Sequence, residues 1–343
     1  MPLTLQDVAK LAGLSAATVS RCLHSPHLVR PDTRQRVLRL MDEHKYVHNI
    51  MAADFSRRRS SVVAVIMPTP AVVAFAQTLI GIQEVAFTHN TPLFVASTHY
   101  KPNKERAILQ QCLEHRFSGV IMAGFDPSNA DLIEVLQSKS IPHILLWEKS
   151  DNPNSCYVGI DNYQSARTAM DYLFSIGHRR VAAVMGPLET SNRTRHRLLA
   201  YRDTLESWGV PYDPDLVLIK EPVLSSGEEV VTYFLSTGRL PTAIFAGSDF
   251  ISLAIMSELR EHGVRVPEDV SVCGFDGNEI SVHIVPQLTS VRVPTTEMGR
   301  QAMTFLTEML KGEKRDQLRQ CLLPTELVVR RSCAPVRMPD TVF

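Results

Sequence analysis

Short apolar runs that alternate with amphipathic stretches constrain the fold of this 343-residue chain more than any other feature. Runs such as "VVAVIM" (62–67) and "GVIMAG" (119–124) show no polar alternation. Similar runs lie at 92–97, 142–147, 180–186, 242–247 and 269–275. A strand that is apolar throughout must be covered on both faces, as in a parallel sheet between layers of helices. The two series of runs therefore predict an α/β body of two lobes, each with its own parallel sheet.

An all-helical segment precedes this body, because the apolar period up to about residue 45 is helical throughout. The first apolar stripe, the set of residues on one face of a predicted helix, consists of Leu5, Val8, Ala9 and Ala12. After Gly13, Ser15 is suited to cap a second helix. The buried face of this second helix would carry Val19, Cys22 and Leu23, and its opposite face Ala17, Ser20, Arg21 and His24. Val37, Leu40 and Met41 form a third stripe, on which these two short helices can pack.

Charge is distributed unevenly between the helical segment and the body. Residues 1–61 carry a net charge of +5 and the remainder −5, so the whole chain is neutral. A basic helical domain indicates a polyanionic partner, although chance variation in surface charge explains the asymmetry equally well.

Composition and motifs exclude several classes of protein. No apolar run approaches the ~18 to 20 residues of a membrane helix, and the N-terminus lacks the pattern of a secretory signal. Six cysteines are scattered without CxxC pairs or zinc-ligand spacing, which favours reduced thiols in the cytoplasm and no metal site. We find no nucleophile elbow, HExxH, P-loop or GxGxxG pattern, so we expect neither an enzyme nor a bound cofactor.

Polar residues follow several of the apolar runs, where ligands of open parallel sheets bind. Trp147 and Glu148 follow "HILL" (143–146), and Ser248 with Asp249 follow "TAIFAG" (242–247). Asp249 immediately precedes a helical stretch and can serve as its cap instead of touching a ligand. Asp276 is followed by a Gly-Asn loop, and here ligand contact is favoured.

Four segments, in order, resemble those of the LacI/GalR family of transcription regulators. They are "TLQDVAKLAGLSAATVSRCL", "LFSIGHRRVAAVMG", "VPEDVSVCGFDG" and "LTSVRVPTTEMGRQA". The resemblance implies a helix-turn-helix headpiece (1–49), a hinge helix or linker (50–61), an effector-binding and dimerisation domain (62–335) and a tail (336–343). Within the body, the N-lobe would comprise about 62–160 and 293–325, and the C-lobe about 161–290. The tail segment "RRSCAPVRMPDTVF" contains no leucine heptads, so we expect a homodimer without a tail coiled coil.

In this family the second helix lies in the major groove of a roughly palindromic double-stranded operator. The resemblance implies base contacts by Ala16, Ala17 and Arg21, with Arg21 the candidate for a bidentate contact to guanine. It implies phosphate contacts by Thr4, Ser15, Thr18, Ser20, His24, Tyr46 and Asn49. Ala52 and the wedge residue Phe55 would enter the minor groove. The hinge departs from the family pattern at His48, Ala53, Asp54 and Phe55.

The resemblance further implies a small effector, a sugar or a sugar acid, bound between periplasmic-binding-protein-like lobes. The implied contacts are Phe75, Trp147, Arg193, Arg197, Ser248, Asp249 and Asp276. Arg193 shares a helical face with Arg197 if the helix begins after Ser191, and two cations in the cleft would suit a gluconate-like acid. Alternatively, Arg193 lies in a solvated loop before that helix.

We therefore predict a cytoplasmic bacterial regulator, nucleoid-associated when bound to DNA, that represses transcription under control of this effector. The alternative is a solute-binding or sugar-processing protein that uses the same α/β cleft. Such a protein would have no use for the helical segment at residues 1–49.

Overall fold

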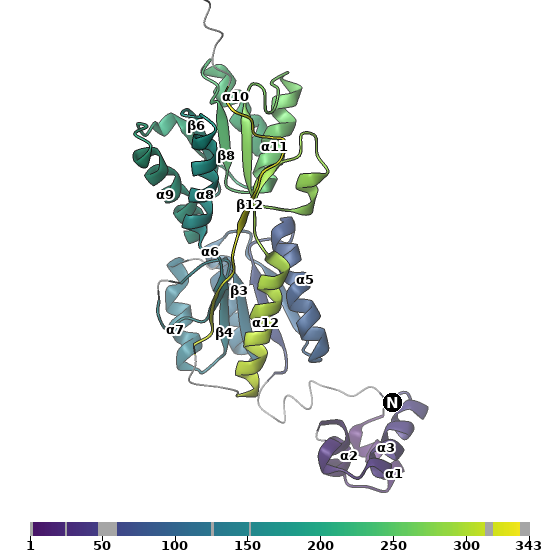
Figure 1. Ribbon diagram of the computed structural model, residues 1–343. Coiled ribbons are helices and arrows are strands. Elements are labelled where there is room, and N and C mark those ends of the chain that lie inside the picture. Colours follow the sequence, from purple (N-terminus) through teal and green to yellow (C-terminus); the bar gives the residue numbers. More distant parts are fainter. Residues whose placement is uncertain are drawn as a thin grey trace, which may run out of the picture. The chain divides into compact units, whose positions relative to one another are not determined.

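The computed structural model describes residues 3–24, 26–46, 60–124, 127–150, 152–312 and 318–336 (Figure 1). The chain divides into two compact units, Met1–Ser60 and Ser61–Phe343.

The first unit is helical and small. It contains α1 (Leu5–Ala12), α2 (Ala16–His24), the 3₁₀ turn η1 (Pro26–Leu28) and α3 (Pro31–Glu43). All three apolar stripes of the sequence meet in its core, whose buried members are Val8, Ala9, Ala12, Val19, Cys22, Val37 and Met41. Gly13 has a φ of +63° and ends α1, which lets the chain reverse direction into α2.

Helix α3 also satisfies backbone carbonyls at the ends of the other two helices. The Arg36 Nη2 group donates to the carbonyl oxygen of Ala12 at 2.6 Å, and Arg34 Nε donates to that of Cys22 at 3.4 Å. The last carbonyls of a helix have no partner within the helix itself. Two of the basic residues in this unit therefore have a structural role.

The second unit contains two six-stranded sheets, which confirms the predicted α/β class. The first sheet has the order β11-β5-β4-β3-β1-β2. Its strands are β1 (Val63–Met67), β2 (Leu93–Ser97), β3 (Gly119–Ala123), β4 (His143–Leu146), β5 (Tyr157–Gly159) and β11 (Gln320–Leu322). Every pairing in it is parallel. Associated with this sheet are α5 (Val73–Thr88), α6 (Pro102–Glu114), η2 (Pro127–Asn129), α7 (Ala130–Ser138) and α12 (Thr295–Lys311).

The second sheet has the order β12-β10-β9-β8-β6-β7, parallel except for the antiparallel pairing of β10 with β12. Its strands are β6 (Val181–Met185), β7 (Val217–Ile219), β8 (Ala243–Ala246), β9 (Ser271–Asp276), β10 (Thr289–Arg292) and β12 (Glu326–Val328). Associated with it are α8 (Asn162–Ser175), α9 (Asn192–Ser207), η3 (Pro214–Leu216), α10 (Ser225–Ser236), α11 (Asp249–Glu261) and η4 (Glu279–Val282).

Strand β1 shows why its sequence is apolar at every position. Val63, Val65 and Met67 belong to the cluster that includes core residues of α5 and α12. Ala64 and Ile66 belong to a separate cluster formed with α6 and α7. Successive side chains point to opposite faces of a strand, so both sets must be apolar when helices cover both faces.

The chain passes between the two lobes three times, from β5 to α8, from β10 to α12 and from β11 to β12 (Figure 1). All three passages lie side by side between the sheets. Each lobe is therefore assembled from segments that are distant in sequence.

Helices α5 and α12 pack closely because glycines face the partner backbone. A Cβ added at Gly299 would lie 2.0 Å from the carbonyl oxygen of Thr78, and one added at Gly81 equally close to that of Thr296. Neither position has room for a side chain unless the helices separate.

Substitution of Gly299 by Ala is therefore expected to lower the free energy of unfolding by about 1–3 kcal/mol, the usual effect of overpacking. The loss should exceed the gain from the better helix propensity of alanine. Urea unfolding of the second unit measures the change. Gln301→Ala on the same helix is the control, and equal stability of the two variants would contradict the close-packing argument.

Candidate functional site

Helix α2 of the first unit presents small and basic side chains away from its core. Ala17 and Arg21 are exposed, whereas Ala16, Thr18 and Ser20 are half-buried. Ser15 caps the helix as predicted, because its Oγ accepts a hydrogen bond from the backbone N–H of Thr18 at 3.2 Å. The exposed face thus carries a single long donor, Arg21, between small side chains that allow close approach to another surface.

Several hydroxyls predicted to contact phosphates already have partners in this unit. The Thr4 hydroxyl donates to Asp7 Oδ2 at 2.7 Å and accepts from the Asp7 N–H, which forms a capping box. The Ser15 and Thr18 hydroxyls lie 2.9 Å apart and bond to each other. These side chains can contact a phosphate only by sharing or exchanging such bonds.

The other predicted DNA contacts are placed only in part. His24 is the last residue of α2, and half-buried Tyr46 follows α3, with its N–H donating to the carbonyl oxygen of Met41 at 2.8 Å. Asn49, Ala52 and Phe55 lie outside the described residues, as do the divergent hinge positions His48, Ala53 and Asp54.

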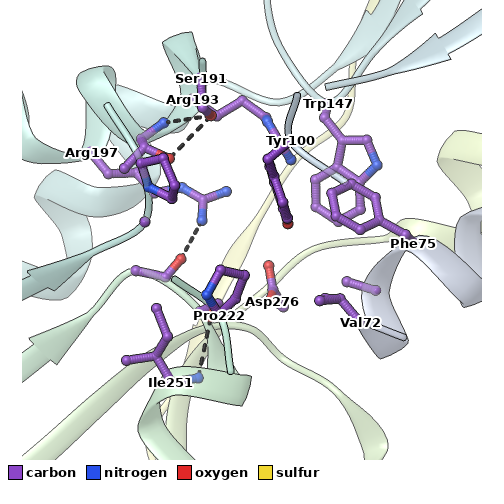
Figure 2. Close-up of a pocket in the computed structure, with 16 residues that line it drawn as sticks. Val72, Phe75, Tyr100, Trp147, Ser191, Arg193, Arg197, Pro222, Ile251 and Asp276 are labelled. Carbon is purple, nitrogen blue, oxygen red and sulfur yellow. Dashed lines mark hydrogen bonds between the residues drawn. The ribbon is translucent and has the colours of Figure 1, made fainter. Parts of the chain in front are cut away.

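A cavity in the second unit lies where strands of both sheets reach their carboxyl ends, and it comprises about 560 Å³ of space, including the part that is open to solvent. Figure 2 shows its lining. Of the seven predicted effector contacts, Phe75, Trp147, Arg193, Arg197, Ser248 and Asp276 line this cavity, and Asp249 does not. Residues 72–147 of the lining come from the first lobe and residues 186–276 from the second.

Arg193 lies in α9, whose N-cap is Ser191, so the solvated-loop alternative is wrong. Its side chain is buried, and its guanidinium carbon lies 5.3 Å from the ring centre of Phe75 and 5.8 Å from that of Trp147. A Cβ at Gly124 would lie 2.6 Å from Arg193 Nη2, so this cation of the second lobe reaches the backbone of the first. The guanidinium forms no hydrogen bond or ion pair with the described residues, which leaves its donors available to a ligand.

Arg197 is held more tightly than Arg193. Its Nε and Nη2 donate to Asn162 Oδ1 at 3.0 and 2.8 Å, and its Nη1 donates to the carbonyl oxygen of Gly247 at 2.5 Å. The guanidinium lies 3.5 Å from the ring centre of Phe275. Burial lowers the pKa of Arg197 to about 9, while the nearby Asp276 carboxylate raises it. Arg197 therefore still carries its charge at neutral pH.

Asp276 is a buried acceptor at the end of β9. Burial raises the pKa of Asp276 to about 7, while Arg197 acts to lower it. A carboxylate in such surroundings gains from hydroxyl donors supplied by a ligand. Together, two cations and one acceptor suit a molecule with an acid group and hydroxyls.

Asp249 has neither of the two roles considered for it. Ser248 caps α11 instead, with its Oγ accepting from the N–H of Ile251 at 3.3 Å, and it also lines the cavity. The Asp249 carboxylate accepts three hydrogen bonds. The donors are the N–H of Asn278 (2.7 Å), the Ser281 hydroxyl (2.8 Å) and the Ser290 hydroxyl (2.5 Å). Its carboxylate therefore links α11 to the segment after β9 and to β10.

Sequence reasoning missed Tyr100, Pro222 and Ile251 in the lining. Tyr100 comes three residues after β2, so the strand-end rule could have found it; burial raises the pKa of Tyr100 to about 12. Tyr100, Trp147 and Asp276 have positive φ angles of 57°, 77° and 118°. Non-glycine residues rarely adopt such angles, and here three of them surround one cavity.

The part of the chain that the structure describes contains no cluster of His, Cys, Asp or Glu that could hold a metal ion. Nor do the described ranges include a helix that is long and apolar enough to cross a membrane.

A helix-turn-helix unit and a two-lobed body with a strand-end cavity together define a ligand-binding DNA-binding protein. Residues 4–49 match the family model for bacterial regulatory proteins of the lacI family, and residues 170–333 match that for a periplasmic binding protein-like domain. The HTH-type transcriptional regulator DegA of Bacillus subtilis (strain 168) is 31% identical over 338 residues, 98% of this chain and 99% of DegA.

Two solved structures are similar over nearly the whole chain. The lac repressor dimer bound to operator and the anti-inducer ONPF has a TM-score of 0.85 at 26% identity, covering 97% of this chain and 100% of that chain. A complex of the transcriptional regulator CelR with cellobiose has a TM-score of 0.71 at 30% identity, covering 96% and 99%. This chain belongs to the LacI family and is a DNA-binding transcriptional regulator. Its relatives are regulators rather than enzymes, in agreement with the predicted lack of catalytic activity.

Arg21→Ala is expected to weaken binding to a specific operator by about 1–3 kcal/mol, because a bidentate contact to a base would be lost. Binding to random duplex should fall much less. Fluorescence anisotropy at a fixed salt concentration, with DNA from upstream of the protein's own gene, measures both affinities. Arg39→Ala removes one exposed positive charge from α3 and serves as the control. Equal losses on both duplexes would show that Arg21 contacts a phosphate instead.

Proposed function

We propose that this regulator is a repressor that binds a roughly palindromic operator as a homodimer and responds to a gluconate-like sugar acid. The proposal retains the division into headpiece (1–49), hinge (50–61) and effector domain (62–335), with the DNA contacts assigned above. A protein with this role acts in the cytoplasm, on the nucleoid. The CelR–cellobiose complex supports a sugar-type ligand, and the operator-bound lac repressor dimer supports both repression and the two-fold arrangement.

The observation that carries the effector proposal is the unpaired guanidinium of Arg193 inside the cavity. An acid group can supply the charge-assisted hydrogen bonds that this side chain does not make with the described residues. Phe75 and Trp147 meet edge to face, with ring centres 5.3 Å apart, and form an apolar wall for carbon-bound hydrogens of a sugar chain. Asp276 accepts from the hydroxyls.

Control of DNA binding follows from linkage between the cavity and the lobes. The cavity is lined by both lobes, so a ligand that contacts both favours one relative arrangement of them. If the operator-binding state prefers another arrangement, effector and operator affinities change by the same factor. A coupling of about 1–3 kcal/mol corresponds to roughly 5- to 150-fold in operator affinity.

Thermal unfolding with matched ligand pairs tests the effector proposal. Gluconate and sorbitol differ in having a carboxylate or a CH₂OH at one end. Gluconate at about 100 times its Kd should raise the Tm by about 5 °C or more, and sorbitol much less. Arg193→Gln should weaken acid binding about 10-fold or more, whereas Arg202→Gln, an exposed change on the same helix, should not. Equal shifts from acids and alditols would overturn the proposal.

The homodimer proposal rests on an apolar stripe of α5. Val73, Ile80 and Phe87 are spaced seven residues apart and are 39%, 49% and 85% exposed. They therefore follow one face of the helix, which lies beside the face that contacts α12, where Glu84 pairs with Arg300. On the edge strand β2, Val95 is also exposed and points to the face of the sheet that α5 covers. An exposed apolar stripe of this kind is suited to an isologous interface between two copies.

Phe87→Glu is expected to shift the protein from dimer to monomer, because the substitution would bury a charge at the interface. Sedimentation equilibrium measures the mass directly. Leu199→Glu, at an exposed apolar position on α9, is the matched control and should leave the dimer intact. A dimer that persists in Phe87→Glu, or dissociates equally in both variants, would refute this assignment of the interface.

A further inference from the structure

Asn162 occupies the first passage of the chain between the lobes and lies next to the cavity. It is the first residue of α8 and follows Asp161, whose side chain caps the helix by accepting from the N–H of Gln164 at 2.8 Å. Only 2% of its surface is exposed. A buried amide at such a position must find partners for both its donor and its acceptor atoms.

The nitrogen and the oxygen of the Asn162 amide bond to cavity-lining residues of different lobes. Its Nδ2 donates to the carbonyl oxygen of Trp147 at 2.8 Å, directly after β4 of the first sheet. Its Oδ1 accepts from both Nε and Nη2 of Arg197, on α9 of the second lobe. Asn162 thereby fixes the position of Arg197 relative to Trp147.

The chemistry of this contact is informative because a two-pronged guanidinium contact usually involves a carboxylate. Here Arg197 is held by two neutral oxygens, the amide oxygen of Asn162 and the carbonyl oxygen of Gly247. Within the part of the chain that the structure describes, Arg197 forms no salt bridge. Three of its five N–H groups are used in these contacts, which leaves two N–H groups and a positive charge that acts on Asp276 only from a distance.

We propose that Asn162 is a positioning residue that determines the charge preference of the cavity. It orients Arg197 through a neutral acceptor, so the positive charge remains for an acidic effector to neutralise. Aspartate at this position would preserve the acceptor but pair with Arg197 in advance. The acid group of a ligand would then have no free cation at Arg197, while the hydroxyls of a neutral sugar would be affected less. This inference rests on the proposed sugar-acid effector.

Isothermal titration of the intact protein with aldonate–alditol pairs of four to six carbons, gluconate and sorbitol among them, tests the proposal. Asn162→Asp is expected to lower the ratio of acid to alditol affinity by tenfold or more. Asn162→Ala removes the positioning without adding charge, so both affinities should fall by a similar factor. Gln164→Glu adds the same charge to an exposed site of the same helix and should leave both affinities unchanged.

The outcomes separate this inference from the proposed effector. A wild-type protein that shows no preference for any acid, or that binds no member of the pairs, overturns the effector proposal and this inference with it. A wild-type preference for the acid that persists in Asn162→Asp overturns the role of Asn162 alone. Circular dichroism reports whether each variant folds. If the Asn162→Asp variant does not fold, the Asn162→Ala variant tests the proposal instead. An acid affinity equal to that of the wild type in Asn162→Ala would then overturn the positioning role of Asn162.

Discussion

The requirement to bury both faces of a parallel sheet determines most of this molecule. Helices must cover each side, so consecutive strands are joined by crossover connections and the carboxyl ends of the strands share one edge. Loops at that edge are free to carry polar side chains while the strands beneath remain apolar. With two such sheets joined by three passages, the strand-end loops of both lobes surround one cavity. Trp147, Ser248 and Asp276 are adjacent in space for this reason, although they are far apart in sequence.

Charge is used differently in the two units. In the helical unit, Arg34 and Arg36 satisfy helix carbonyls, whereas Arg21 is directed away from the core. In the body, two buried arginines belong to the cavity, and one of them is oriented by neutral oxygens. Burying a cation without a carboxylate partner is unfavourable, and such an arrangement is common where a ligand supplies the missing charge. The body therefore combines a densely packed scaffold with cavity arginines that form no direct ion pair with the described residues.

The sequence predicted the long elements well and the short ones poorly. All seven apolar runs are strands. The sequence did not predict the remaining strands, which have only three or four residues each: β5, β7, β10, β11 and β12. Strands β7, β11 and β12 are also partly exposed, so they lack a continuous apolar run. Strand-end reasoning identified the cavity residues Trp147, Ser248 and Asp276, and the family resemblance added Phe75, Arg193 and Arg197. Neither predicted the role of Asp249, which depends on the long-range partners Ser281 and Ser290. Contacts of this kind join distant segments, and no local pattern reveals them. The predicted contacts at Asn49, Ala52 and Phe55 lie outside the described residues.

The left-handed backbone of Tyr100, Trp147 and Asp276 has a consequence for how this protein can evolve. Each such conformation costs on the order of 1 kcal/mol or more and persists because neighbouring groups impose it. Glycine at any of the three would relieve the strain but remove a side chain that faces the cavity. At Trp147 the packing of the fully buried ring outweighs the strain, because truncation of a buried tryptophan costs about 3–5 kcal/mol. At Asp276 stability and ligand recognition compete, because glycine there would relieve both the strain and the burial of a carboxylate. A search for heat-resistant variants would be drawn toward Asp276, and its products would be those that no longer offer an acceptor in the cavity.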